Sequence, residues 1–236
     1  MSNYYSVIPS ESVHGWKKPS GSINKLNQTC IFESDNPHGF PQLKPYTGEI
    51  PKRLVSWHTP AVKSLHASVR DSFVHFMVDD YYFESVWTSP KRLLTVSGNV
   101  RGILSPTFSV YEVHPRAMNI WNVYRQRWVC KYLEIHGVQV IPVALWADES
   151  TFDYCFEGIP RDSVVCVSTV GTRRLADRAL FQKGLEEMFE RLNPRVLLVY
   201  GEYMPVDFSE YMDDVYYYPS EWQQKRERMD ASVPVY

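Results

Sequence analysis

Short apolar runs alternate with longer amphipathic stretches from Phe73 onward, and each apolar run ends in polar or small residues. Runs that are almost continuously Val, Ile and Leu are typical of strands buried on both faces, as in a parallel sheet covered by helices. We therefore expect five strands, with a sixth at 215–218 as an option. The five lie at residues 73–78, 102–104, 138–145, 164–167 and 196–200.

The stretches between these runs carry apolar residues at helical spacing and residues that start or stop helices. Pro115 suits the first turn of a long helix, and Gly137 lies just beyond its end. Ser220 is a favoured cap for the last helix. Helices are predicted at 82–94, 114–136, 150–156, 175–192 and 220–229.

This alternation predicts an α/β fold with a parallel sheet of five to six strands and helical crossovers. Such strands form either an incomplete TIM-like barrel or an open doubly wound sheet, and periodicity alone does not separate the two. The first strand is not followed by a glycine-rich phosphate-binding turn, which favours the incomplete barrel. In both architectures, ligands bind at the carboxyl ends of the strands.

The first seventy residues differ from the rest, because prolines and glycines recur and no periodic pattern lasts ten residues. We expect an irregular N-terminal arm at 1–70 and a single α/β domain at 71–236. Large apolar residues such as Phe40 and Trp57 are too frequent for a solvated tail, so the second half of the arm should pack on the domain.

Composition limits the classes of protein to which the chain can belong. Of its 236 residues, 44% are hydrophobic and 22% are charged, and no apolar stretch approaches a membrane span, which indicates a soluble globular protein. A formal charge of −2 excludes nucleic-acid binding by bulk charge, although a local basic groove stays open. The polar and aromatic start does not resemble a secretion signal, so we expect a cytoplasmic protein without membrane partners.

Missing motifs exclude several common chemistries. The four cysteines are widely spaced and predict neither a disulfide framework nor a CxxC zinc site. The sequence contains no HxH or HExxH pair, no Walker-type phosphate loop and no GxSxG elbow. Zinc hydrolases, P-loop ATPases and acyl-transfer enzymes are therefore disfavoured.

Acidic residues follow three of the predicted strands. Asp79 and Asp80 end the first, and Asp148 and Glu202 hold equivalent positions after the third and fifth. Asp79, Asp148 and Glu202 are candidate ligands for Mg²⁺ or Mn²⁺, and Asp79, Asp80 and Asp148 are candidate catalytic groups. The alternative is that these residues cap helices or face solvent.

Hydroxyl groups follow two other strands, with Ser105 and Ser109 after the second and Ser168 and Thr169 after the fourth. Hydroxyls near helix starts can bind phosphate, but they are equally typical of turns and caps.

Three larger side chains are further candidates for ligand binding. Arg125 and Arg127 lie two positions apart in the long helix, so they face different ways and only one of them should point at the sheet or the site. The inward arginine would be either an anion clamp or a buried ion-pair partner. Strand alternation puts Trp146 on the same side as Asp148, where its ring would either stack on a ligand or fill the core.

Several segments resemble a known family, the domain of unknown function 4417, which occurs in bacteria, phages and other mobile elements. They span residues 36–202 in the family's order and are Asn36–Pro41, Phe76–Asp80, Gly102–Tyr111, Ile120–Trp128, Val140–Trp146, Phe152–Pro160 and Val167–Gly171. The family's Pro-Asp-Phe-Ser is Pro106-Thr-Phe-Ser109 here, so any role of that aspartate is lost or supplied elsewhere. The resemblance implies a replication-associated protein that acts on nucleic acid or nucleotides.

Three functional hypotheses follow. The first is an enzyme that uses a divalent metal to act on a phosphodiester or nucleotide. The second is a non-catalytic protein that binds a nucleotide or a single strand at the same site. The third is an interaction module for a host replication or defence factor. The oligomeric state stays open.

Overall fold

The computed structural model describes residues 31–172, 174–202 and 206–231, and its side chains to residue 226. Its strands form a four-stranded sheet in the order β1-β2-β3-β4 and a three-stranded sheet in the order β5-β6-β7, and all pairs are parallel. A single parallel bridge between Val143 and Cys166 lies between the two sheets. The strands are β1 (Leu54–Ser56), β2 (Phe73–His75), β3 (Gly102–Leu104), β4 (Val140–Ile141), β5 (Val164–Ser168), β6 (Val196–Tyr200) and β7 (Val215–Tyr218).

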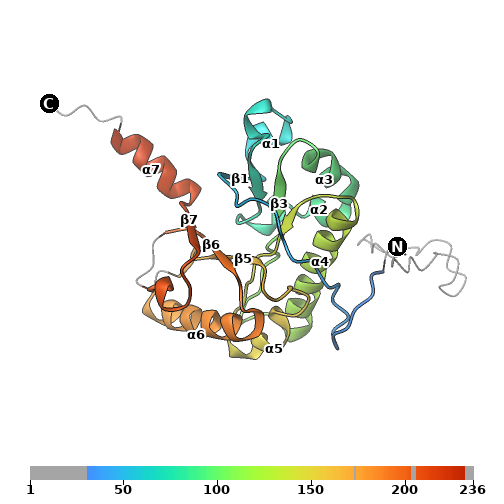
Figure 1. Cartoon of the computed structure of the whole chain (residues 1–236), viewed down its shortest axis with the longest axis vertical. Coiled ribbons are helices and arrows are strands. Elements are labelled where there is room, and N and C mark those ends of the chain that lie inside the picture. Colours follow the sequence, from blue (N-terminus) through green and yellow to red (C-terminus); the bar gives the residue numbers. More distant parts are fainter. Residues whose placement is uncertain (1–30, 173, 203–205, 232–236) are drawn as a thin grey trace, which may run out of the picture.

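Helices separate most of these strands and lie along the sheets (Figure 1). They are α1 (Pro60–Lys63), α2 (Ser85–Thr88), α3 (Pro90–Ser97), α4 (Arg116–Ile135), α5 (Phe152–Cys155), α6 (Leu175–Leu192) and α7 (Glu221–Ala231), and four short 3₁₀ turns lie at Ala67–Val69, Asp80–Tyr82, Glu149–Thr151 and Phe208–Glu210. Figure 1 shows α7 extending away from the rest of the fold. The α/β class with parallel strands is therefore confirmed.

Helix ends follow the local chemistry of the sequence. Gly137 adopts a φ of 79° just after α4, and Asn193 adopts the left-handed conformation that ends α6. The backbone N–H of Gln223 donates to Oγ of Ser220 at 3.2 Å, as predicted for the cap of α7. The helix expected at 82–94 is instead divided at Ser89, because a residue before proline avoids the helical conformation.

One face of the strands, which we call the inner face, carries a single apolar cluster with members from all seven strands. Its buried residues are Tyr46, Leu54, Phe73, Leu104, Ile141, Val143, Val164, Cys166, Val196, Leu198, Tyr200 and Tyr218. The rings of His75 on β2 and Tyr200 on β6 lie 4.4 Å apart, although these strands are not neighbours. The Tyr218 hydroxyl donates to the carbonyl of Pro51 at 2.5 Å, which brings β7 to the segment before β1.

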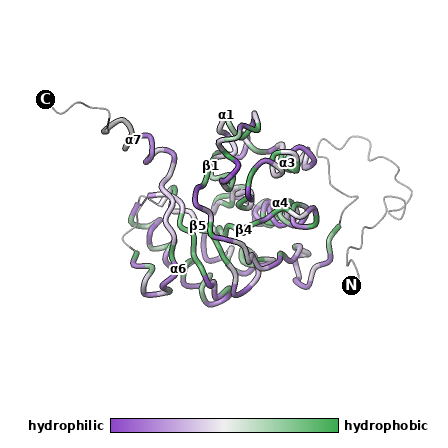
Figure 2. Tube along the Cα trace, turned by 45° about the horizontal axis from the view of Figure 1, so that its top comes forward, coloured by the Kyte–Doolittle hydropathy of each residue, from purple (hydrophilic) through white to green (hydrophobic). Residues whose placement is uncertain are grey.

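The opposite face of the strands packs against helices. One cluster joins Val55, Val74 and Ile103 to residues of α2, α3 and α4, and another joins Val165 and Leu197 to residues of α6. In Figure 2, β5 has hydrophobic colour, whereas the start of α7 is hydrophilic.

The segment predicted as an irregular arm contributes to the sheet. Leu54–Ser56 forms β1 and pairs in register with Phe73–His75, so the described residues form seven strands rather than five or six. Three residues are too few to produce a recognisable period. Phe32, Phe40, Leu43 and Tyr46 are also buried. The first thirty residues, including Cys30, lie outside the described part of the chain.

Two further expectations concern the cysteines and the membrane. Cys130, Cys155 and Cys166 are buried free thiols, and burial raises the pKa of each of them. Among the described helices, none combines the length and apolar character needed to span a bilayer.

We predict that Phe40→Ala lowers the free energy of unfolding by about 3–5 kcal/mol, because the ring is fully buried between the arm and the domain. Urea denaturation would measure the change. Val113→Ala is the control, because Val113 is 88% exposed and its loss should have little effect. A Phe40 variant as stable as this control would contradict the packing of the arm.

Candidate ligand site at the carboxyl ends of the strands

The loops that follow β1, β2 and β7 meet at one edge of the fold, because parallel strands place their carboxyl ends together. Three rings from the first two loops form a continuous run, which we call the aromatic rim. Tyr81 and Tyr82 lie 4.0 Å apart between ring centroids, and Tyr82 and His58 lie 4.0 Å apart. Tyr81 is 69% exposed, so the rim ends in an open ring face.

An open pocket of about 700 Å³ adjoins the rim between α1 and the start of α7. His58 belongs to both the rim and the pocket. The lining includes a cation, Lys63, and an anion, Glu221. Oγ1 of Thr59 lies 3.5 Å from a carboxylate oxygen of Glu221, which links the loop after β1 to α7.

Three buried polar side chains on the inner face lie next to the pocket residues. The N–H of His58 donates to Oγ of Ser56 at 3.2 Å, and the N–H of Glu221 donates to the hydroxyl of Tyr200 at 3.4 Å. The third side chain, His75, pairs in register with Ser56. Burial lowers the pKa of His75 to about 3 and raises that of Tyr200 to about 12, so both are neutral near pH 7.

Sequence reasoning missed these three residues, although each of them is a polar residue that ends an apolar strand. In the sequence alone, a histidine or tyrosine at such a position is indistinguishable from one that fills the core.

Asp80 and Ser109 are two predicted site residues that the structure brings together. The backbone N–H and the hydroxyl of Ser109 donate to the two carboxylate oxygens of Asp80 at 3.0 and 2.7 Å. These bonds tie the loop after β2 to the loop after β3. Asp79 is exposed and precedes the 3₁₀ turn without a side-chain cap bond.

The other two predicted acids have local partners. Asp148 accepts hydrogen bonds from the N–H and hydroxyl of Ser150, so it caps the 3₁₀ turn at Glu149–Thr151. Glu202 forms an ion pair with Arg226 at 3.1 Å. Within the described residues, no group of three or more His, Cys, Asp or Glu is placed to hold a metal, so Asp79, Asp148 and Glu202 do not form one.

The predicted hydroxyl groups mainly join neighbouring strands and loops. Oγ of Ser105 is fully buried and accepts hydrogen bonds from Gln126 and from the N–H of Val143, both at 2.8 Å. Thr169 donates to the carbonyl of Glu202 at 2.6 Å, and Ser168 accepts from the N–H of Val170 at 3.3 Å.

Arg125 and Arg127 face different ways, as their spacing predicts, and both are buried. Arg125 pairs with Glu84 at 2.7 Å, and its guanidinium lies 4.0 Å from the ring centroid of Phe108. Arg127 donates to the carbonyls of Cys155 and Glu157 at 2.6 and 2.8 Å, and burial lowers its pKa to about 10. Both arginines connect α4 to surrounding loops.

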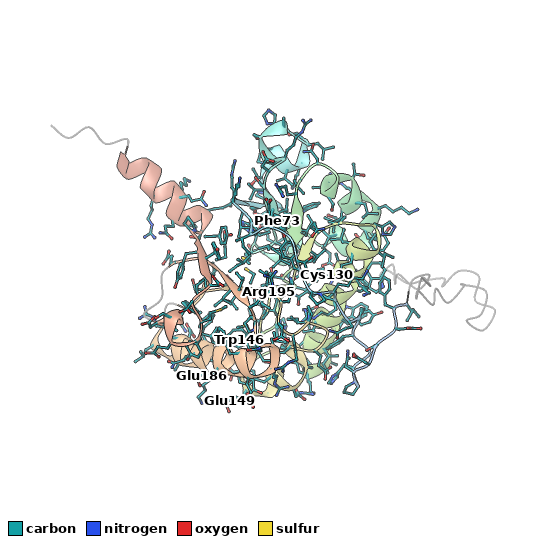
Figure 3. The ribbon with its side chains drawn as sticks, in the orientation of Figure 1. Phe73, Cys130, Trp146, Glu149, Glu186 and Arg195 are labelled. Carbon is teal, nitrogen blue, oxygen red and sulfur yellow. The ribbon has the colours of Figure 1, made fainter. Side chains whose placement is uncertain are left out.

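Trp146 lies between the strands and α6 (Figure 3). Its ring packs 5.3 Å from Phe181 and 5.8 Å from Phe156, measured between centroids. A β-carbon on Gly184 of α6 would lie only 2.1 Å from the indole nitrogen, so this glycine makes room for the ring. Trp146 is partly buried, and these contacts favour the core-filling alternative over a stacking platform.

Residues 32–219 match the family model described as a domain of unknown function, DUF4417. The chain belongs to this family. The Gene 1 protein of Mycobacterium phage D29 is 39% identical over 215 residues, which cover 91% of this chain and 78% of the phage protein. The Gene 1 protein of Mycobacterium phage L5 is 38% identical over 217 residues, which cover 92% of this chain and 93% of that protein. No solved structure matches the chain significantly.

We predict that Trp146→Ala in this DUF4417 protein lowers the free energy of unfolding by about 1–3 kcal/mol, because it empties the partly buried space beside Gly184. Chemical denaturation would measure the loss. Trp222→Ala is the matched control, since Trp222 is 70% exposed. Equal stability of the two variants would contradict a packing role for Trp146.

The pH dependence of stability should also report on buried His75. The unfolded chain binds a proton near pH 6.5, whereas the pKa of folded His75 is about 3. Stability should therefore fall as the pH is lowered from about 6.5 to about 3, by on the order of 5 kcal/mol in total. Urea denaturation at about pH 7, 5 and 4 would measure the slope.

Two variants provide the comparison for this slope. His75→Gln should flatten it, whereas His66→Gln should leave it unchanged, because His66 is exposed. A slope that survives His75→Gln would show that other groups cause the pH dependence.

Proposed function

We propose that this chain is a phage or mobile-element protein that binds a nucleotide or a single strand of nucleic acid at the aromatic rim and its pocket. The observation that carries the proposal is the run of His58, Tyr82 and Tyr81 beside a pocket of about 700 Å³. The run ends in an exposed ring face, as a base-stacking platform requires.

The charge of the protein agrees with binding dominated by stacking. Lys63 is the cation of the pocket, and the whole chain carries a formal charge of −2. Few phosphates can then be neutralised, so affinity should depend only weakly on salt concentration. Each stacked base contributes about 1–3 kcal/mol without strong sequence preference.

The biological setting of the proposal comes from the family. Both relatives described above are phage proteins named Gene 1 protein, and these names state no activity. An association with replication belongs to the proposal and rests on the family resemblance alone. A cytoplasmic location is likewise part of the proposal.

Metal-assisted action on a phosphodiester is the enzymatic form of this proposal, with Mg²⁺ or Mn²⁺ held by Asp79, Asp148 and Glu202. The positions of the described side chains favour the binding form instead. Asp148 caps a turn and Glu202 pairs with Arg226, so neither carboxylate is directed to a common centre with Asp79.

We also propose that the seven strands form an incomplete TIM-like barrel. The strands follow one another in chain order, and one inner cluster collects residues from all of them. The contact between Tyr218 and Pro51 would close the circle through a side chain instead of a backbone ladder. In such a barrel the aromatic rim lies on the face that carries active sites.

A protein-interaction module is the second candidate function, and three exposed apolar side chains near the start of α4 favour it. Tyr111, Val113 and Met118 are 54%, 88% and 48% exposed. Contiguous exposed apolar side chains often mark protein-binding surfaces. The partner would be a host or phage protein.

We predict that Tyr81→Ala weakens the binding of a short oligothymidylate by about 1–3 kcal/mol, because one stacking ring is removed. Fluorescence anisotropy with a labelled oligonucleotide would measure the change. Tyr216→Ala is the control, since Tyr216 is an exposed tyrosine within β7 that does not belong to the run of rings. If the intact protein binds no oligonucleotide, the protein-interaction candidate becomes the better explanation.

A further inference from the structure

Three hydrogen-bond donors gather on the inner face at the carboxyl ends of β1, β2 and β6. Ser56 and His75 have no exposed surface, and Tyr200 is 3% exposed. Ser56 pairs in register with His75, and the ring of His75 lies 4.4 Å from that of Tyr200. We call these three side chains the donor cluster.

Each member of the donor cluster accepts a hydrogen bond from a backbone N–H. Met77 donates its N–H to Nδ1 of His75 at 3.3 Å, which leaves the proton of the neutral ring on Nε2. Ser56 and Tyr200 accept from the N–H groups of His58 and Glu221. The remaining protons of all three side chains are therefore available for donation.

These protons lack acceptors among the residues that the structure describes. Nε2 of His75 is buried and has no hydrogen-bond partner there, and no described group accepts from Ser56 or Tyr200. Buried donors in proteins are normally paired, because an unpaired one costs free energy. Three such donors at the ligand-binding edge indicate that an oxygen-rich group completes the cluster.

We propose that the donor cluster binds the terminal phosphate of a nucleotide or oligonucleotide whose base stacks on the aromatic rim. This inference rests on the proposed function and specifies the end of the ligand that is recognised. Hydroxyl and imidazole N–H donors suit phosphate oxygens, and bonds to a charged acceptor are stronger than neutral ones.

The position of the cluster favours a terminal phosphate over one within a strand. Ser56 and Tyr200 are held by the backbones of His58 and Glu221, which themselves line the pocket. The cluster thus lies on the buried side of the pocket lining. A phosphate at a chain end needs to reach these donors at one point only, whereas an internal phosphodiester would require the strand to continue through the buried inner face.

The charges that line the pocket predict how two substitutions change the binding of a phosphorylated ligand. Lys63 favours an entering phosphate, and the carboxylate of Glu221 opposes it. Glu221→Gln should therefore strengthen the binding of a phosphorylated ligand, and Lys63→Gln should weaken it.

The decisive experiment compares oligothymidylates that carry a 5′-phosphate, a 3′-phosphate or no terminal phosphate, measured by fluorescence anisotropy with the full chain. The inference expects at least one phosphorylated form to bind about tenfold more tightly than the unphosphorylated form. Ser56→Ala and Tyr200→Phe each remove one donor and should remove most of this preference.

Two buried residues supply matched controls. Ser97 donates to the carbonyl of Leu93 within α3, and Tyr218 donates to Pro51, so neither hydroxyl is available to a ligand. Ser97→Ala and Tyr218→Phe should keep the full preference for the phosphorylated form. Equal loss in the controls and in the cluster variants would overturn the assignment.

The outcomes separate this inference from the proposed function. Equal affinity for phosphorylated and unphosphorylated strands overturns phosphate binding by the donor cluster and leaves base stacking intact. If no strand binds, the base-stacking proposal is wrong. NMR of the ¹⁵N-labelled His75 ring with inorganic phosphate then tests phosphate binding by the donor cluster alone. A saturable shift of the Nε2 resonance would support phosphate binding by the donor cluster, and an unchanged resonance would overturn it.

Discussion

Parallel pairing of strands in chain order is the constraint on which the rest of the structure depends. It places all the carboxyl ends on one edge and gives the strands one shared inner face. Because each crossover must return along the outside, the helices cover the opposite face. The loops that carry His58, Tyr81 and Glu221 are then neighbours, although they lie far apart in the sequence.

Much of this arrangement could be predicted from periodicity. The strands at 102–104, 196–200 and 215–218 and the helix at 175–192 have the predicted bounds, because each is a clear apolar or amphipathic run that ends in polar residues. The run at 138–145 yields only Val140–Ile141 as a strand, since Pro142 lacks an N–H for the ladder. Strand β1 was missed because three residues in the short stretch between Pro51 and Pro60 carry no detectable period.

The sequence says less about the site than about the fold. It identified polar residues after the strands as candidates, but it did not show whether each would meet a ligand or a neighbouring loop. Asp80 and Ser109 bind each other, and Asp148 caps a turn. Conversely, His75 resembles a core residue in its sequence context, and only the three-dimensional arrangement shows that Nε2 lacks a described partner.

The contact between Tyr218 and Pro51 has a consequence for the order of folding. These residues lie 167 positions apart, and their hydrogen bond joins the two ends of the strand series. Closing so long a loop is entropically expensive until the intervening strands have assembled, so this contact should form late. During synthesis, β1 emerges long before β7, and even in the finished fold no strand of the described residues pairs with its outer edge. The nascent chain therefore carries an unprotected sheet edge, which is a route to mispairing between chains.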